Sequence, residues 1–150
     1  MLTVSLTLAA VVFSMAVALR FGGAPERLGA GVVGGMLAIA FAARPLLPPQ
    51  FDRVDPVSLG VDVLGFAAFL CIGIFAWRLW PLCAASLQLL ALSAHLTRAL
   101  DIHIHPFVYA ALKSGPSYLI LLLLVGGSIL HRRRIRTFGS DRCWRSWSQS

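Results

Sequence analysis

Five long apolar stretches, separated by charged or turn-forming residues, constrain this chain more than any other feature of its sequence. A helix of about 20 apolar residues crosses the roughly 30 Å hydrocarbon core of a lipid bilayer. The sequence therefore predicts an all-α fold, a polytopic transmembrane bundle of about five helices. The predicted helices cover residues 2–19, 28–43, 57–77, 79–97 and 106–130.

Composition excludes an ordinary soluble domain. The chain of 150 residues is 58% hydrophobic and 13% charged, whereas roughly a quarter of the residues in a soluble domain are charged. The five predicted helices use most of the length. We therefore expect a single transmembrane domain, residues 1–130, followed by a basic cytoplasmic tail, residues 131–150.

Two of the five stretches depart from the simple pattern. The second, Leu28 to Ala43, would reach only about 24 Å at about 1.5 Å per residue, so we expect it to be short. The fifth contains Lys113 and the pair Gly115-Pro116, and a proline inside a helix kinks or breaks it. If the break is complete, Pro106 to Ser114 lies at the membrane interface and the bundle has four helices plus a broken fifth.

Basic residues indicate the orientation, because Lys and Arg near helix ends concentrate on the cytoplasmic side. With the C-terminal tail in the cytoplasm, five crossings place the N-terminus outside. Nine of the 13 Lys and Arg residues then face the cytoplasm, and the other four are Arg44, Arg53, Arg98 and Lys113. We predict a multi-pass protein of the bacterial inner membrane, with an organelle membrane as the alternative.

The tail combines basic and aromatic residues, and the net charge of the chain is +7. Such a combination can indicate nucleic-acid binding, but arginines directly after a membrane span are typical of contact with an anionic leaflet. We therefore predict contact with membrane lipids, or alternatively with a protein partner, and no nucleic acid. The residues concerned are Arg132, Arg133, Arg134, Arg136, Trp144 and Trp147.

Glycines in the second stretch predict close helix packing. Gly31 and Gly35 form a Gly-x-x-x-Gly motif, and Gly34 extends it. Small residues at this spacing let the backbone of another helix approach closely. The partner helix belongs either to this chain or to another subunit.

Polar residues at membrane depth are the candidate ligand or ion-pair residues, since such residues are costly and usually face the bundle interior. Asp62 and Lys113 lie at similar depths from the outer side, which predicts an ion pair that either serves a ligand or only fixes helix register. Gln88 and His95 are seven residues apart and therefore share one face of a helix. The candidates are Asp62, Gln88, His95 and Lys113.

Histidines near the outer side raise a metal hypothesis. His95, His103 and His105 could supply imidazole ligands, although their spacing matches no recognised zinc motif. A b-type haem would need a second axial ligand facing His95, and no other histidine lies inside an apolar stretch. The cofactor therefore stays unknown, with a metal or haem as the alternatives considered.

The sequence contains no phosphate-binding loop, nucleophile elbow or His-Glu-x-x-His helix, which favours a non-catalytic protein. We expect an accessory or assembly subunit of a larger membrane complex, respiratory or photosynthetic, in contact with other membrane subunits or with itself. One alternative is a small oligomeric transporter, or a ligand- or metal-binding protein, that uses the outer polar cluster. Another is a membrane enzyme acting on a lipid or quinone, with His95 or Asp62 as the base.

Overall fold

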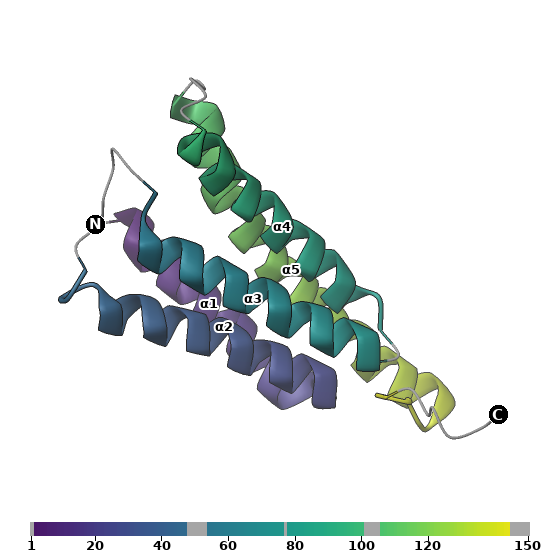
Figure 1. Cartoon of the computed structure of the whole chain (residues 1–150). Helices are drawn as coiled ribbons and strands as arrows, with labels where there is room; N and C mark the ends of the chain where they lie inside the picture. Colours follow the sequence, from purple (N-terminus) through teal and green to yellow (C-terminus); the bar gives the residue numbers. More distant parts are fainter. Residues whose placement is uncertain (1, 48–53, 77, 101–105, 145–150) are drawn as a thin grey trace.

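The protein is a bundle of five α-helices (Figure 1). The computed structural model describes residues 2–47, 54–76, 78–100 and 106–144. Within these ranges it contains no β-strand, only an isolated bridge between Ala76 and Trp144. The predicted all-α fold with five helices is confirmed. The helices are α1 (Leu2–Phe21), α2 (Ala24–Ala43), α3 (Pro56–Phe75), α4 (Trp80–Ala99) and α5 (Pro106–Phe138).

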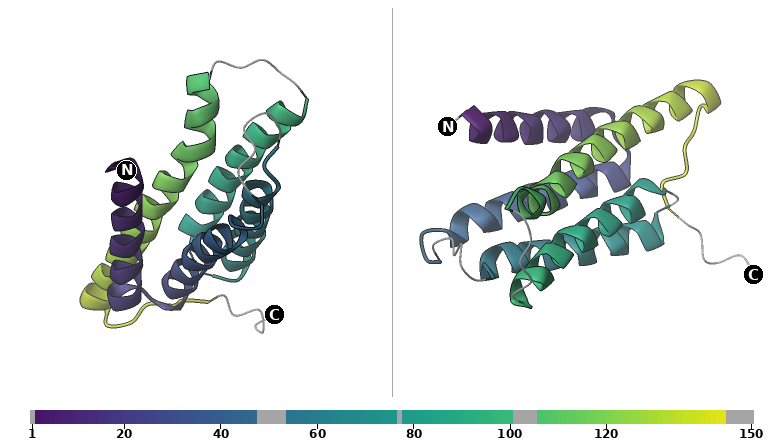
Figure 2. Two further views of the ribbon diagram at one scale, coloured as in Figure 1. Left: turned by 90° about the vertical axis from the view of Figure 1, so that its left-hand side faces the viewer. Right: turned by 90° about the horizontal axis from the view of Figure 1, so that it is seen from above.

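Consecutive helices pack against each other in antiparallel directions, and α5 also packs on α1, which closes the bundle. Figure 2 shows α5 passing between α1 and α4. We call one end of the bundle the Arg78 end, where α1, α3 and α5 finish; the opposite end is the His95 end. Figure 1 shows that α4 and α5 lean away from α1, α2 and α3 toward the His95 end. The helices therefore converge toward the Arg78 end.

Helix α2 begins four residues earlier than the sequence predicts. Gly23 is its N-cap, Pro25 lies in its first turn, and the Gly23 amide donates to the Glu26 carboxylate over 3.0 Å. A glutamate at this position satisfies an amide that would otherwise lack a partner. Charged Glu26 and Arg27 thus belong to the helix, and the expectation of a short second helix is wrong, since α2 has 20 residues.

Helix α5 continues through Pro116 over 33 residues, so the alternative of a complete break at Gly115-Pro116 is wrong. Pro116 removes one backbone hydrogen bond, and the turns on either side keep theirs while packing against α1 and α4. The helix also passes the predicted boundary at residue 130. It ends at Phe138, and Gly139 follows with a φ of 73°, a conformation that glycine adopts at helix ends.

The connection between α2 and α3 is anchored where both helices end. Arg44 donates to Asp55 over 2.7 Å, and Asp55 caps α3 through the Val57 amide. Burial raises the pKa of Asp55, but hydrogen bonds from Arg44 and Ser58 outweigh this effect and lower the pKa to about 2. This ion pair and cap hold the ends of α2 and α3 together at the His95 end.

Among the described residues, three helical segments are long and apolar enough to cross a membrane: α2, α3 and Ala111–Phe138 of α5. Helix α1 is apolar but shorter over its residues Ser5–Phe21. Helix α4 carries more polar side chains; Gln88 and His95 are buried inside the bundle, and Arg98 is exposed in its last turn. A membrane location is therefore plausible.

Trp80 lies at the centre of the packing near the Arg78 end. A methyl group added at Gly29 of α2 would come within 2.5 Å of its ring, and one at Gly127 of α5 within 2.9 Å. The ring also meets Phe69 of α3 edge-on, with 6.2 Å between centroids, and its Nε1–H donates to Glu26 over 3.0 Å. Trp80 thus links α4 to α2, α3 and α5, and the two glycines make the space for it.

This packing predicts different effects for two glycines of α2. Gly29→Leu should lower the free energy of unfolding by about 1–3 kcal/mol, because the added side chain overlaps the Trp80 ring. Gly31→Leu is the matched control, because a Cβ at Gly31 meets nothing within 4 Å. It should leave stability unchanged or slightly higher, since leucine is the better helix former. Thermal unfolding in detergent measures the stability of both variants. Equal losses of stability in Gly29→Leu and Gly31→Leu would contradict the packing of Trp80 against Gly29.

Candidate functional site

A cavity of about 240 Å³ lies among the helices in the half of the bundle nearer the His95 end. Most of its wall is apolar and comes from α1, α2, α3 and α5. Five polar side chains also line it: Thr7, Asp62, Gln88, Ser117 and Tyr118. An apolar cavity with a few convergent polar groups is the usual form of a small-molecule site.

The strongest polar contact at this cavity joins Asp62 of α3 to His95 of α4. The distance from Asp62 Oδ2 to His95 Nε2 is 3.1 Å. His95 is buried, whereas 17% of the Asp62 side chain is exposed and lines the cavity. His95 Nδ1 is buried without a hydrogen-bond partner among the described residues. The arrangement is an acid–base pair in which His95 is buried and Asp62 is partly open to the cavity.

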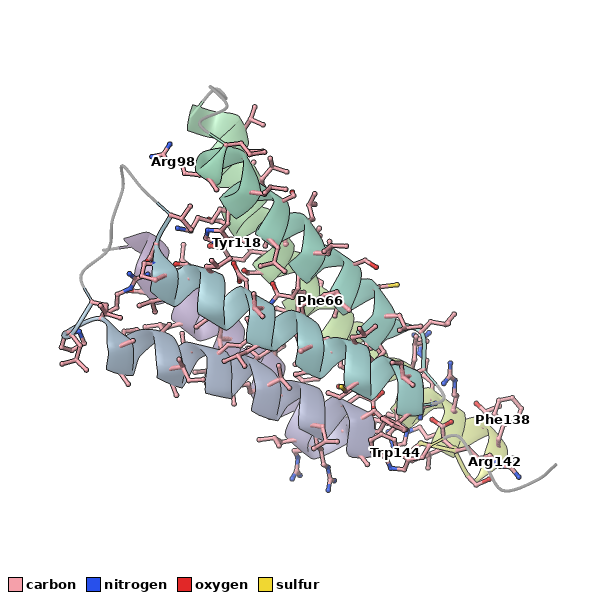
Figure 3. The ribbon with its side chains drawn as sticks, viewed as in Figure 1. Phe66, Arg98, Tyr118, Phe138, Arg142 and Trp144 are labelled. Atoms are coloured by element: carbon pink, nitrogen blue, oxygen red, sulfur yellow. The ribbon has the colours of Figure 1, made fainter. Side chains whose placement is uncertain are left out.

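The other polar side chains complete the cavity wall. Tyr118 of α5, which Figure 3 labels, has its hydroxyl 2.9 Å from the Thr7 hydroxyl of α1. Gln88 is buried, and its Nε2 reaches the sulfur of Met36 at 3.5 Å, a weak acceptor. Gly65 makes room for this amide, because a Cβ there would come within 2.4 Å of Gln88 Nε2. Gln88 therefore keeps hydrogen-bonding capacity at the cavity wall.

Three of the four predicted ligand or ion-pair residues thus gather here: Asp62, Gln88 and His95. The partner of Asp62 is His95, whereas the sequence analysis paired Asp62 with Lys113. Lys113 is half-buried and makes no ion pair with a carboxylate among the described residues. The depth of two residues along their helices does not determine whether their side chains meet. This also depends on how each helix is rotated about its own axis.

The metal hypothesis involves residues outside the described ranges. His103 and His105 are not among the described residues, so the triad with His95 stays a prediction. Within the described ranges, no three His, Cys, Asp or Glu side chains are placed to hold a metal ion together.

The predicted glycine interface divides into two parts. A methyl group at Gly34 would lie 2.8 Å from Met15 of α1, so Gly34 packs inside the bundle. Gly31 and Gly35 are exposed, and a Cβ at either position would meet nothing within 4 Å. No described residue therefore packs against Gly31 or Gly35.

A second polar cluster, at the Arg78 end, was missed by the sequence analysis. We call it the Arg78 cluster; it consists of Glu26, Arg78, His131 and Asp141. Arg78 Nε lies 3.3 Å from Glu26, and Arg78 Nη1 donates to Asp141 over 3.0 Å. His131 Nδ1 lies 2.8 Å from Asp141. Glu26 and Arg78 are both buried, and the cluster joins residues that are up to 115 positions apart (141 − 26).

The Arg78 cluster holds the segment after α5 against the bundle. Burial raises the pKa of Asp141, but hydrogen bonds from Arg78 and His131 outweigh it and keep the pKa below its usual value. A little further on, Cys143 lies against Gly23, and Trp144 bridges to Ala76. Figure 3 shows Arg142 and Trp144 at this end of the bundle. His131 is thus part of the folded bundle and not of a free tail.

The predicted lipid-contact residues mostly lie on the surface of the last turns of α5. Arg133, Arg134 and Arg136 are exposed, and Arg132 stacks over the Phe21 ring at 4.1 Å. Trp144 is partly exposed, and Trp147 lies outside the described residues. The basic surface therefore continues the helix axis beyond the apolar part of α5.

Comparison with known proteins adds no relative: no protein-family model, curated protein or solved structure matches this chain.

The Arg78 cluster predicts how the C-terminal segment is released. The test uses a background variant that lacks Cys71 and Cys83. In this background, Asp141→Asn removes the carboxylate that Arg78 and His131 share. The released segment should then expose Cys143, which should react several-fold faster with a maleimide. The stabilisation by Asp141 is present above its ordinary pKa of 3.8 and is lost as the pH falls through the lower value of the folded protein. Ser140→Asn, at an exposed neighbour, is the control and should react at the original rate. Equal rates in all three proteins would contradict this role of Asp141.

Proposed function

We propose that this chain is an integral membrane protein that binds a small amphiphilic molecule in the cavity beside Asp62 and His95. The observation that carries the proposal is the partly buried Asp62–His95 pair at the wall of a mainly apolar cavity. Ionisable side chains inside a membrane protein are costly and commonly mark a ligand or proton pathway. A register-fixing pair would need no adjoining cavity.

The size and lining of the cavity define the ligand class. A volume of 240 Å³ is below the roughly 300–1,000 Å³ of pockets that enclose drug-sized molecules, so it suits a small molecule or the head of a larger one. The Asp62 carboxylate is an acceptor, and the hydroxyl groups of Thr7, Ser117 and Tyr118 line the same mainly apolar cavity. The ligand we propose carries an amine or hydroxyl donor for Asp62 on an apolar body.

The membrane arrangement is also a proposal. We infer that all five helices cross the membrane, with the Arg78 end and the arginines of α5 in the cytoplasm. Antiparallel neighbours and the bias in Lys and Arg support this orientation. Burial of Gln88 and His95 supports a membrane-spanning α4, because its polar groups then avoid lipid. A bacterial inner membrane is the location that we propose.

Binding can be tested by screening small amines, alcohols and quinols for thermal stabilisation of the protein in detergent. We expect amines or alcohols with an apolar body to raise the unfolding temperature, and Asp62→Asn to weaken their binding about tenfold, because a charge-assisted hydrogen bond is lost. Ala40→Phe should also abolish the effect, because Ala40 lines the cavity.

The matched controls are Ala38→Phe, on the exposed face of the same helix, and Ser93→Ala, an exposed hydroxyl of α4 that bonds only its own helix. Both should keep the stabilisation. If no compound stabilises the wild type, or if Asp62→Asn binds as the wild type does, this function is wrong.

A second candidate function, a subunit of a larger membrane assembly, is favoured by the outward-facing glycines of α2. Gly31 and Gly35 leave a shallow face where another helix can approach the backbone closely. Exposed Leu28 and Ile39 adjoin this face and would supply apolar contacts. A helix of a neighbouring membrane subunit is the occupant that we propose.

The assembly hypothesis predicts that the double variant Gly31→Leu, Gly35→Leu folds but loses its neighbour. The particle extracted from the native membrane should fall to the mass of the chain with its detergent. Gly115→Leu is the control, because Gly115 of α5 also faces open space and should leave the mass unchanged. A double variant with the mass of the wild-type particle would exclude this face as the contact.

A further inference from the structure

We propose that the groove between α4 and α5 at the Arg78 end binds one anionic phospholipid. The groove has a volume of about 1220 Å³ and is lined mainly by leucines of the two helices. It lies apart from the cavity beside Asp62, and no residue lines both. The inference therefore does not depend on the proposed ligand site.

Glycines create the hollow in this groove. Gly126 and Gly127 of α5 line it, and a methyl group at Gly126 would meet nothing within 4 Å. Trp80 packs over Gly127, so the ring forms part of the floor. A leucine at position 126 would project into the space that the groove offers to a guest.

The apolar part of the groove has the dimensions of one membrane leaflet. It extends from Leu119 to Leu130 on α5, which is about 17 Å at about 1.5 Å per residue, and Arg134 lies one turn further on. Half of a hydrocarbon core of roughly 30 Å is about 15 Å, so an acyl chain can lie along the leucines while its head group reaches the basic end. The exposed leucines Leu79, Leu122 and Leu130 provide the apolar contact.

Charge at the basic end selects an anionic head group. The side chain of Arg134 is 44% exposed and reaches Asp141 only at 3.9 Å, so its guanidinium keeps free donors for a phosphate. Arg78 and Asp141 also line the groove, but Arg78 is already paired with both Asp141 and Glu26 within the Arg78 cluster. Arg133 and Arg136 are exposed close by and add positive potential. A phosphate without a compensating cation in the same head group therefore fits better than a zwitterionic head group.

Native mass spectrometry can test this site on the full chain in mixed micelles containing phosphatidylglycerol or phosphatidylcholine with identical acyl chains. We expect one phosphatidylglycerol to stay bound at concentrations where phosphatidylcholine is lost. Arg134→Gln should weaken phosphatidylglycerol binding about fivefold, the effect of one basic residue near an anionic lipid. Gly126→Leu should abolish retention of the single lipid by filling the groove.

Two matched variants separate a defined site from general attraction. Arg133→Gln removes the same charge from an exposed position that does not line the groove, and Gly115→Leu adds the same side chain where no groove lies. Both should retain the lipid within about twofold of the wild type. Equal losses for Arg133→Gln and Arg134→Gln would overturn the proposal in favour of unspecific attraction. Full lipid retention in Gly126→Leu would also overturn the proposal. So would a wild-type protein that carries a bound polypeptide in place of the lipid, if Gly126→Leu displaces this polypeptide.

Discussion

The guanidinium of Arg78 is buried, and the need to neutralise it organises this protein. A buried charge is tolerated only when it is paired and hydrogen-bonded. Its two carboxylates come from opposite parts of the chain, Glu26 at the start of α2 and Asp141 after α5. Trp80 donates to the same Glu26. Satisfying one charge therefore joins α2, the α3–α4 turn and the C-terminal segment, and it is here that the helices converge.

The half of the bundle nearer the His95 end has polar groups that are less completely paired than those of the Arg78 cluster. We propose the ligand site there for this reason. Asp62 and His95 satisfy each other at one contact, but His95 Nδ1 keeps no described partner and Asp62 faces a cavity. Arg78 Nε also lacks a hydrogen bond, yet Glu26 lies 3.3 Å from it as a counter-charge. A closed network fixes structure, whereas a partly satisfied pair beside a cavity can accept a guest.

Glycines have several separate roles in this protein, and each role depends on the absence of a side chain. Gly29 and Gly127 admit the Trp80 ring, and Gly65 admits the Gln88 amide. Gly126 leaves the hollow between α4 and α5 that we assign to a lipid, while the outward face with Gly31 leaves room for another helix. Of the three glycines that the sequence predicted to pack closely, Gly34 meets Met15 of α1, whereas Gly31 and Gly35 meet nothing within 4 Å among the described residues.

The sequence by itself determined the five helices, because the length and spacing of apolar runs depend only on local order along the chain. It also singled out Asp62, Gln88 and His95 as polar residues within apolar stretches. Only the tertiary structure decided that Asp62 meets His95 and not Lys113, that α5 passes unbroken through Pro116, and that Asp141 returns to Arg78. These outcomes depend on how each helix is rotated about its axis and on contacts between distant segments, and neither is encoded in the periodicity of a single helix.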